Sequence, residues 1–459
     1  MLKLYPDQSA CLDNLLDKLQ EGYRSPLLVA PCGFGKTVVF SEITRRAKAK
    51  GNSVLICVHR QELLRQTYKT LEKFGVSYGV IASGYPDRYG ELIQVATIQT
   101  LARRLGRIRY KPKLIIFDEC HHALSPTFLK VINHFSDSKI IGVTATPYRL
   151  DGQSLNKVFD CMVIGATADV LIKNKRLAKP IYYAPPQRFE LDNLKTQMGD
   201  YDKVEVEKRI DKPFITGDVI EHYSRLCYGK KAVVFCVSVR HAEHVAQQFN
   251  NAGIPSASID GSMIQEDRMA IIRKLENGNI KVLTSCELIS EGFDLPSIEV
   301  AIMLRPTQSL CIWIQQAGRA LRISEGKDKA IILDHVGNIF RHGAIENITE
   351  WSLTGMEKRI KSKETLPTVR RCKNCFAIIT GSKCQECGSE PELTEKELKI
   401  KEGELKALEI SEIKKENKKQ QGKCRTLDEL IELGISRGYK NPRGWAYAVY
   451  NSRQRIHRR

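Results

Sequence analysis

Two series of short apolar, β-branched runs, each alternating with helix-like stretches, constrain the fold most strongly. The first series comprises residues 27–30, 53–58, 93–96, 113–117 and 140–144, and the second comprises 231–237, 256–260, 281–285, 300–304 and 330–334. Strands that alternate with helices form parallel sheets with helices on both faces. The sequence therefore predicts an α/β protein with two tandem parallel-sheet lobes. Prolines interrupt the pattern between the series, so we expect the inter-lobe connection within 165–215, at Pro180, Pro185, Pro186 and Pro213.

The composition narrows the class of protein. Hydrophobic residues make up 42% of the 459 residues, enough for packed cores, which excludes collagen-like and wholly disordered chains. No apolar run approaches the roughly 20 residues of a membrane span, and residues 1–20 lack a signal-peptide core. We therefore expect neither a membrane nor a secreted protein. The net charge of +19 favours a polyanionic partner, such as nucleic acid, although many intracellular proteins are simply basic.

The cysteines indicate the compartment and a metal site. Ten of the 14 are scattered singly, which does not resemble a disulfide framework and favours a reducing cytoplasm. The other four form two Cys-x-x-Cys pairs separated by eight residues: Cys372, Cys375, Cys384 and Cys387. Four thiolates at this spacing are typical of a closed, structural Zn²⁺ site. A redox dithiol is the weaker alternative, because such a pair normally occurs singly. We predict a zinc ribbon over 365–392.

The C-terminal part of the chain differs from the two lobes in composition and in its pattern of apolar residues. Residues 393–424 are rich in Glu and Lys and predict a charged helical linker, with a partly disordered linker as the alternative. Residues 425–459 begin with a short amphipathic pattern and continue with arginines among Tyr439, Trp445, Tyr447 and Tyr450. Such a region can neutralise phosphates and stack on bases. It can equally be a small helical cap whose aromatic residues form its own core.

A glycine-containing segment, APCGFGKT at 30–37, lies between a predicted strand and a predicted helix. Gly33 and Gly35 permit the backbone to curl around a phosphate, next to the favourable N-terminus of the helix. Lys36 is expected to reach the β- and γ-phosphates of ATP, and the Thr37 hydroxyl to bind Mg²⁺. Ala30 stands where the general pattern has glycine. The alternative is an ordinary glycine turn.

A pair of acidic residues follows the predicted buried strand LIIF at 114–117. The C-terminal ends of parallel strands are where open α/β sheets bind ligands. Asp118 is therefore expected to hold Mg²⁺, directly or through water, and Glu119 to polarise the attacking water. A surface turn or helix cap is the alternative. Together with the glycine segment, the pair predicts ATP hydrolysis.

These two motifs, followed by Thr144-Ala-Thr-Pro147, resemble those of a superfamily 2 helicase. The sequence Asp-Glu-Cys-His resembles the DEAH/DECH branch more than the DEAD-box RNA helicases. The resemblance covers 1–345 and implies two RecA-like lobes, at 1–170 and 171–350, with the connecting segment reaching about 215. It also implies roles for further residues: Gln8 at the adenine base, Asp294 at the ATP site, His121, Thr144 and Thr146 in coupling, Gln315, Arg319 and Arg322 in the arginine-finger motif, and Arg60, Thr97, Gln99, Thr100 and Ser285 at nucleic acid.

The arginine pair suggests how ATP hydrolysis could depend on the position of the second lobe. Arg319 and Arg322 are spaced so that they can share one helical face directed at the γ-phosphate. An arginine finger is worth about 10³–10⁵ in rate, so hydrolysis would depend on closure of the second lobe over the first. A surface ion-pair cluster is the alternative for these arginines. A satisfied buried histidine is the alternative for His121, and strand-end caps are the alternative for Thr97, Gln99 and Thr100.

The sequence therefore predicts an ATP- and Mg²⁺-dependent helicase or translocase with a structural Zn²⁺. The combination of lobes, zinc ribbon and basic tail resembles phage and prophage DNA helicases related to the UvsW and XPB-like repair helicases. This favours DNA over RNA, action at forks or junctions, and the cytoplasm of a bacterium or phage-infected host. An RNA helicase, the motor subunit of a restriction or defence assembly, and a non-catalytic nucleic-acid-binding scaffold are the alternatives. The zinc ribbon or tail can also serve a protein partner.

Overall fold

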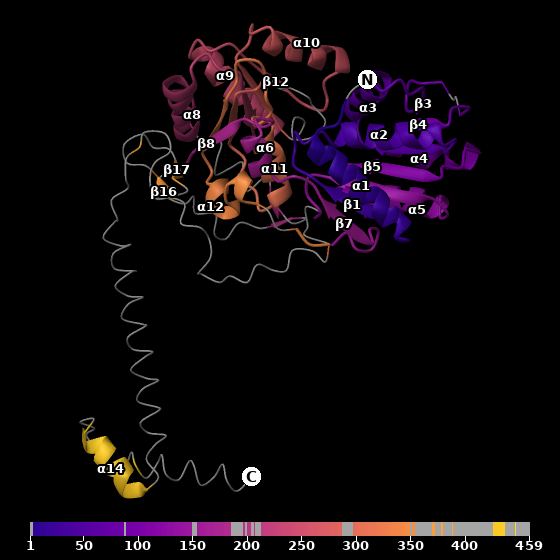
Figure 1. Ribbon diagram of the computed structural model, residues 1–459. Coiled ribbons are helices and arrows are strands. Elements are labelled where there is room, and N and C mark those ends of the chain that lie inside the picture. The colour runs from indigo at the N-terminus through magenta and orange to yellow at the C-terminus, as the bar shows by residue number, and fades with distance from the viewer. Residues whose placement is uncertain are drawn as a thin grey trace. The chain divides into compact units, whose positions relative to one another are not determined.

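The computed structural model covers the two predicted lobes almost completely and the C-terminal part sparsely (Figure 1). The chain divides into two compact units, Met1–Ser389 and Glu390–Arg459. The described residues are 3–86, 89–148, 154–184, 196–197, 200–202, 206, 213–286, 297–348, 351–353, 370–371, 378–379, 388, 426–436 and 446.

The first lobe is built on a seven-stranded parallel sheet with the order β3-β4-β2-β5-β6-β1-β7. Successive side chains of a strand point to opposite faces of a sheet. Thus Leu28 packs into one apolar cluster, while Leu27 and Val29 pack into another. The sheet is buried on both faces, as parallel sheets require. The strands are β1 (Pro26–Val29), β2 (Val54–Val58), β3 (Gly79–Ile81), β4 (Ile93–Thr97), β5 (Leu114–Asp118), β6 (Lys139–Thr144) and β7 (Cys161–Ile164).

Helices connect and cover these strands. Most of them begin shortly after a strand ends, as expected for right-handed strand-helix-strand connections. They are α1 (Pro6–Gln20), α2 (Lys36–Ala49), α3 (Gln61–Lys73), α4 (Ile98–Arg104), the 3₁₀ turns η1 (Leu105–Arg107) and η2 (Cys120–His122), α5 (Pro126–His134) and α6 (Ala168–Lys173).

The second lobe repeats this architecture with six parallel strands in the order β12-β13-β11-β14-β15-β8. The strands are β8 (Lys179–Tyr183), β11 (Ala232–Phe235), β12 (Ser256–Ile259), β13 (Val282–Ser285), β14 (Val300–Met303) and β15 (Lys329–Asp334). The helices are α8 (Pro213–Cys227), α9 (Val239–Asn251), α10 (Gln265–Glu276), α11 (Leu310–Gly318), α12 (Asn338–His342) and the 3₁₀ turn η4 (Ile345–Asn347). The α/β prediction with two parallel-sheet lobes is confirmed.

All ten strands expected from the sequence are present, each within two residues of its expected bounds. Three other strands of the two large sheets were missed: β3, β7 and β8. β3 is three residues long, and β7 is a partly exposed edge strand, so neither shows a strong apolar pattern. β8 contains Pro180, which the sequence analysis assigned to the connection between lobes. Proline is tolerated here because β8 lies at the edge of the second sheet and pairs with β15.

Short elements make up the rest of the described chain. β9 (Thr196–Gln197) and β10 (Asp200–Tyr201) pair antiparallel, as do β16 (Arg370–Arg371) and β17 (Ile378–Ile379), and α14 spans Leu427–Ser436. The linker at 393–424 and most of the basic region at 425–459 lie outside the described residues. Among the helices that the structure describes, none is both long and apolar enough to cross a membrane.

Candidate active site

The segment at 30–37 forms the turn between β1 and α2. Gly33 and Gly35 have φ angles of 86° and 88°, in the left-handed region that glycine adopts without strain. A Cβ atom on Gly33 would lie 2.5 Å from Cδ2 of Leu177, and one on Gly35 would lie 2.5 Å from Nε2 of Gln8. Both glycines are therefore required by the backbone path and by close packing.

Lys36 is the first residue of α2, and its ammonium folds back onto the turn. Nζ donates to the carbonyl oxygens of Ala30 at 3.0 Å and Pro31 at 3.4 Å. The residue is 9% exposed, and a buried ammonium is stabilised further by an anion. Thr37 follows in the first helical turn. The turn thus presents a cation and a helix N-terminus, the combination that binds phosphate.

Asp118 and Glu119 lie at the C-terminal end of β5, in the centre of the sheet. Glu119 has φ 49° and ψ 49°, an uncommon conformation for a non-glycine residue that often marks functional sites. The Glu119 N–H donates to Oδ1 of Asp118 at 3.0 Å. Burial and the neighbouring Glu119 charge raise the pKa of Asp118 to about 6, against the opposing effect of Lys36. Two adjacent, mostly buried carboxylates favour a bound cation.

A chain of polar contacts leads from these carboxylates to the second lobe. Nδ1 of His121 lies 3.4 Å from Oε2 of Glu119 and 3.3 Å from Oγ1 of Thr144. The Thr144 hydroxyl donates to the Thr146 carbonyl at 2.9 Å and accepts from the Thr146 N–H at 3.1 Å. The Thr146 hydroxyl in turn donates to Sγ of Cys311, in α11, at 2.9 Å. The three residues predicted to couple the lobes therefore form one continuous path between them.

A cavity of about 290 Å³ brings the predicted catalytic groups of both lobes together. The turn between β1 and α2 lines the cavity from the first lobe, and residues that follow α11 line it from the second lobe. The predicted groups among its lining residues are Gly33, Gly35, Lys36, Thr37, Asp118, Glu119, Arg319 and Arg322.

The expectation that the two arginines share a helical face is wrong. α11 ends at Gly318, and Arg319 is its C-cap. Arg322 lies beyond the helix and forms an isolated antiparallel bridge with Leu177. The chain leaves the helix because the segment around Leu321 and Arg322 pairs instead with the connection between the lobes. Both side chains still reach the cavity, from two different turns of the chain.

Two glutamines with predicted roles, Gln8 and Gln315, are buried, although neither lines the cavity. Gln8 is 2% exposed, and its amide accepts from the Tyr5 N–H at 3.0 Å and donates to the Phe34 carbonyl at 2.7 Å. Gln8 thereby holds the turn between β1 and α2 in place. The second N–H of its amide can donate to an adenine base. Gln315, in α11, is 3% exposed, and its Nε2 has no hydrogen-bond partner among the described residues. An unsatisfied buried amide of this kind fits a group that acquires its partner when a ligand binds.

The residues assigned to nucleic acid differ in accessibility. Gln99 is exposed and Arg60 is partly exposed. Thr97 and Thr100 are buried, and their hydroxyls lie 3.0 Å apart, so they satisfy each other in this conformation. Ser285 is buried at the end of β13. Of the five, Gln99 and Arg60 present the accessible surface.

Five other residues with predicted roles lie outside the described part of the chain: Asp294, Cys372, Cys375, Cys384 and Cys387. Within the described part, no group of three or more His, Cys, Asp and Glu side chains could hold a metal ion.

Sequence reasoning missed two residues at this site. Cys311 forms the link from Thr146 to α11. Arg176 lines the cavity and contacts Asp7 and Phe34, which lie 169 and 142 positions earlier in the chain. No motif marks either residue, because each acts through partners that the fold brings from far away in the sequence.

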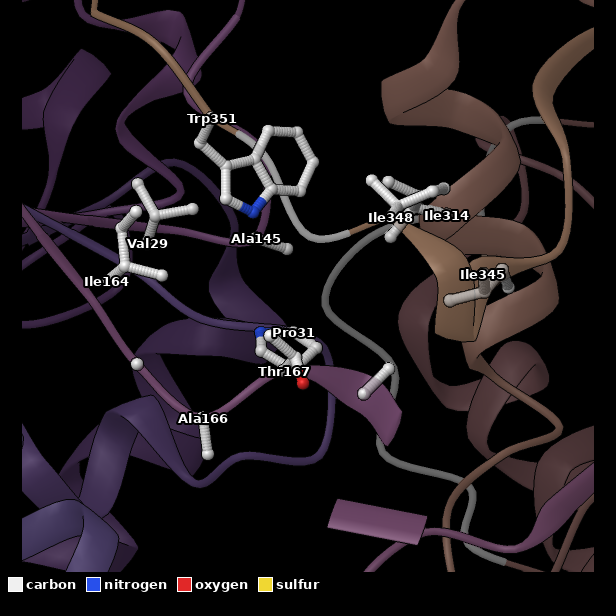
Figure 2. Close-up of a pocket in the computed structure, with 12 residues that line it drawn as sticks. Val29, Pro31, Ala145, Ile164, Ala166, Thr167, Ile314, Ile345, Ile348 and Trp351 are labelled. Carbon is white, nitrogen blue, oxygen red and sulfur yellow. The ribbon is translucent and has the colours of Figure 1, made fainter. Parts of the chain in front are cut away.

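A second cavity, of about 20 Å³, is apolar and lies where the lobes meet (Figure 2). Val29 and Ile164 line it from the first lobe, and Ile314, Ile345 and Ile348 line it from the second, with Trp351 between the two groups. Space of this size holds about one water molecule. It is therefore part of an apolar lobe contact and too small for a nucleotide.

Two family models match the chain. One, described as "Type III restriction enzyme, res subunit", covers residues 1–149, which include the glycine turn and both carboxylates. The other, described as "Helicase conserved C-terminal domain", covers residues 218–324, which include α11 and both arginines. The first match contains strands β1 to β6 of the first sheet, and the second contains β11 to β14 of the second sheet.

Curated proteins from a phage, a yeast and an archaeon are similar along most of this chain. A "51.5 kDa protein" of Lactococcus phage (isolate 7-9) is 34% identical over 84% of this chain and 83% of its own. IRC3 of Saccharomyces cerevisiae, described as an ATP-dependent helicase, is 29% identical over 72% of this chain and 51% of its own. The "DNA 3'-5' translocase XPB2" of Sulfurisphaera tokodaii is 23% identical over 67% of this chain and 76% of its own. This chain therefore spans most of the phage protein and about half of the yeast one.

Solved structures share the fold at low sequence identity. A fragment described as an HsdR subunit of a type I restriction enzyme from Vibrio vulnificus has a TM-score of 0.60 at 20% identity, covering 75% of this chain and 67% of that one. The type ISP restriction-modification enzyme LlaBIII, bound to DNA, has a TM-score of 0.55 at 18% identity, covering 72% and 27%. Saccharomyces cerevisiae Dbp5, bound to RNA and ADP BeF3, has a TM-score of 0.50 at 16% identity, covering 72% and 87%.

Proposed function

Because this chain belongs to the superfamily 2 helicases, which are ATP-hydrolysing enzymes, we propose that it uses ATP to move along or remodel DNA. The observation that carries the proposal is the cavity in which Lys36, the two carboxylates and the two arginines meet. Asp118 and Glu119 come from the first lobe, and Arg319 and Arg322 come from the second. A site divided in this way links hydrolysis to the relative position of the lobes.

The chemistry of this cavity fits ATP with Mg²⁺. The buried Lys36 ammonium and the N–H groups of the glycine turn are suited to phosphates. Asp118 is buried beside Glu119, so a bound cation would stabilise the two neighbouring negative charges. Lys36 would therefore hold the phosphates, while Thr37 and Asp118 would hold the metal. When bound, Mg²⁺ neutralises charge that develops on the transferred phosphate.

Hydrolysis itself assigns one role to each group of residues. Glu119 lines the cavity beside Asp118, where it orients the attacking water and accepts its proton. Arg319 and Arg322 stabilise the charge that develops on the phosphate oxygens. The path through His121, Thr144, Thr146 and Cys311 connects Glu119 with α11, so a change at the phosphate reaches the helix that precedes Arg319.

Two similar proteins support DNA rather than RNA as the substrate. XPB2 is named a DNA translocase, and LlaBIII shares the fold and was solved bound to DNA. The phage relative and the net charge of +19 fit a nucleic-acid enzyme encoded by a phage or prophage. Dbp5, which was solved bound to RNA, shares the same fold, so the fold alone does not decide the substrate. Contacts to phosphate and sugar position a nucleic-acid strand on its protein. RNA and DNA differ at the sugar, so contacts to the 2′-hydroxyl would determine which of them this protein prefers.

The test compares ATP hydrolysis with matched DNA and RNA strands of one sequence, and with duplex, forked and four-way-junction DNA. We expect DNA to stimulate hydrolysis more strongly than RNA, and forks or junctions more strongly than plain duplex. Lys36→Ala is the control, because it removes the phosphate-binding cation and should abolish hydrolysis with every nucleic acid. Equal or stronger stimulation by RNA would contradict the DNA assignment while leaving the ATP site intact.

A motor subunit of a restriction or defence assembly is the second candidate. It is favoured by the match of residues 1–149 to a restriction-enzyme subunit model and by the likeness to an HsdR fragment. Such a subunit would translocate on DNA and leave cutting to a partner chain. Copurification of a nuclease or methyltransferase subunit from the native host would support this candidate over a free-standing helicase.

A structural Zn²⁺ bound by Cys372, Cys375, Cys384 and Cys387 belongs to the same proposal, together with a helical C-terminal region and a cytoplasmic location. The proposal is supported by the spacing of two Cys-x-x-Cys pairs eight residues apart, which is typical of a closed, four-thiolate Zn²⁺ site. Metal analysis of the purified chain should find about one zinc per molecule. Cys384→Ser should lower that content, and zinc-free wild type would contradict the site.

A further inference from the structure

We propose that Arg176 is a positioning residue that ties the base end of the ATP site to Arg322 of the second lobe. Arg176 lies between α6 and β8, in the connection from one lobe to the other. This inference rests on the proposed role of Arg322 in ATP hydrolysis. It goes beyond that role, because it says what holds Arg322 in place.

Arg176 is anchored to the first lobe at two places. One guanidinium nitrogen, Nη1, donates to both carboxylate oxygens of Asp7, at 2.5 and 2.6 Å. The other, Nη2, donates to the Phe34 carbonyl at 2.7 Å. The guanidinium carbon also lies 4.1 Å from the ring centroid of Tyr5. The Arg176 side chain is 10% exposed, so these charge-assisted bonds are little weakened by solvent.

The Phe34 carbonyl is shared between two anchors. It accepts from Gln8, the predicted base-contacting residue, at 2.7 Å as well as from Arg176. Phe34 lies between the two glycines of the phosphate-binding turn. Arg176 therefore contacts the backbone of the turn that is proposed to bind the phosphates of ATP.

The two residues after Arg176 contact the second lobe. Leu177 forms the antiparallel bridge with Arg322, and the Ala178 N–H donates to the Leu321 carbonyl at 2.8 Å. On its other side Leu177 packs on Gly33 so closely that a Cβ there would lie 2.5 Å from its Cδ2. Residues 176–178 thus form one unbroken link from the phosphate-binding turn to the arginine segment.

This link matters because no helix holds Arg322. α11 ends at Gly318, and the bridge with Leu177 supplies the backbone pairing at Arg322. Misplacing a catalytic group by about 1 Å can cost about 100-fold in rate. If the anchor at Arg176 is lost, Arg322 should move and hydrolysis should slow. Nucleotide affinity should change less, because Lys36 and Gln8 remain.

The experiment uses the full-length chain with saturating DNA and compares Arg176→Ala, Arg322→Ala and the double variant. We measure kcat and KM for ATP and the affinity for a fluorescent ADP analogue. Arg176→Ala should lower kcat by about tenfold or more, with ADP affinity changed by less than about threefold. The double variant should be no slower than Arg322→Ala alone, because both changes remove one function.

Two further variants control the result. Lys173→Ala removes an exposed ion pair with Asp169 in the neighbouring α6 and should leave kcat unchanged. Asp7→Asn removes the charge that Arg176 contacts while keeping the shape of the side chain. It should reproduce the loss of kcat. If Arg176→Ala does not fold, Asp7→Asn still tests the inference.

The outcomes separate this inference from the proposed function. If Arg322→Ala slows hydrolysis but Arg176→Ala and Asp7→Asn do not, the inference is overturned and the active site stands. If the double variant is slower by the product of the two single effects, Arg176 acts on the nucleotide directly and the inference is again overturned. If Arg322→Ala hydrolyses ATP at the wild-type rate, the role of Arg322 and the inference fail together.

Discussion

The two lobes have the same sheet order but carry different chemistry. Read across the sheets, β3-β4-β2-β5-β6-β1 corresponds strand by strand to β12-β13-β11-β14-β15-β8. At the end of β5 stand Asp118 and Glu119, which line the ATP cavity. At the matching end of β14 stands Arg305, which pairs with Asp200 at 3.1 Å. In our proposal, this end of the sheet serves catalysis in the first lobe, whereas in the second lobe it carries a buried ion pair.

This difference shows where function resides in such a fold. The order of the strands follows from their apolar runs, which are alike in both lobes, so it does not distinguish them. The residues just beyond the strand ends decide whether a lobe binds ATP. The sequence that follows β8, the counterpart of β1, reads APPQRFE at 184–190 and contains no glycine turn with a lysine. We propose that the second lobe contributes instead through Arg319, Arg322 and the link to Arg176.

The largest effect is expected from changing the first lobe at Glu119. Glu119→Gln removes the group that accepts the proton of water and should lower kcat by about 10³-fold, with ATP binding retained. Single-turnover hydrolysis with DNA measures the chemical step directly. Glu42→Gln, which changes a carboxylate paired with Arg45 in α2 at 2.7 Å, is the matched control and should leave kcat nearly unchanged. A wild-type rate for Glu119→Gln would show that another group performs this role.

A smaller effect, on stability rather than chemistry, is expected at the matching place in the second lobe. Asp200 accepts from Arg305 at 3.1 Å, from the Thr307 hydroxyl at 3.0 Å and from the Gln308 N–H at 2.8 Å. Asp200→Ala leaves the Arg305 charge buried and should cost about 3 kcal/mol of unfolding free energy. Chemical denaturation measures this loss. If kcat of the folded variant fell as far as that of Glu119→Gln, the contrast between the lobes would be wrong.

The smallest effect is a pH dependence that belongs to the second lobe. Burial and the nearby ring of His222 lower the pKa of His335 to about 3. Since the unfolded chain takes up a proton near pH 6.5, stability is fully present above that pH and is lost as pH falls. Between pH 7.5 and 5 the loss due to this group is up to about 2 kcal/mol.

His335→Gln separates this contribution from that of other groups. The variant should lose less stability than the wild type on acidification, when both are unfolded by urea at each pH. Asp334, whose pKa burial raises to about 6, acts in the opposite direction in both proteins and cancels in the comparison. Parallel pH profiles would contradict the assignment to His335.

The sequence predicted those parts of the site that are local in the chain. The glycine turn and the carboxylates each follow a predicted strand, so the strand pattern placed them at one edge of the sheet. The roles of Thr144 and Thr146 were predicted from the resemblance alone. The helical face of Arg319 and Arg322 was mispredicted, because the end of α11 depends on pairing with Leu177, far away in the sequence. Arg176 was missed for the same reason. Edge strand β8 was missed because Pro180 was interpreted as the end of the strand-helix pattern.

The most direct measurement of the central claim, that the ATP site needs both lobes, is single-turnover ATP hydrolysis by Arg319→Ala with saturating DNA. Arg319 belongs to the second lobe, whereas the phosphate-binding turn belongs to the first. The account predicts that the variant binds ATP as the wild type does but hydrolyses it about 10³-fold more slowly. Hydrolysis at the wild-type rate would show that the first lobe acts alone and would contradict the account.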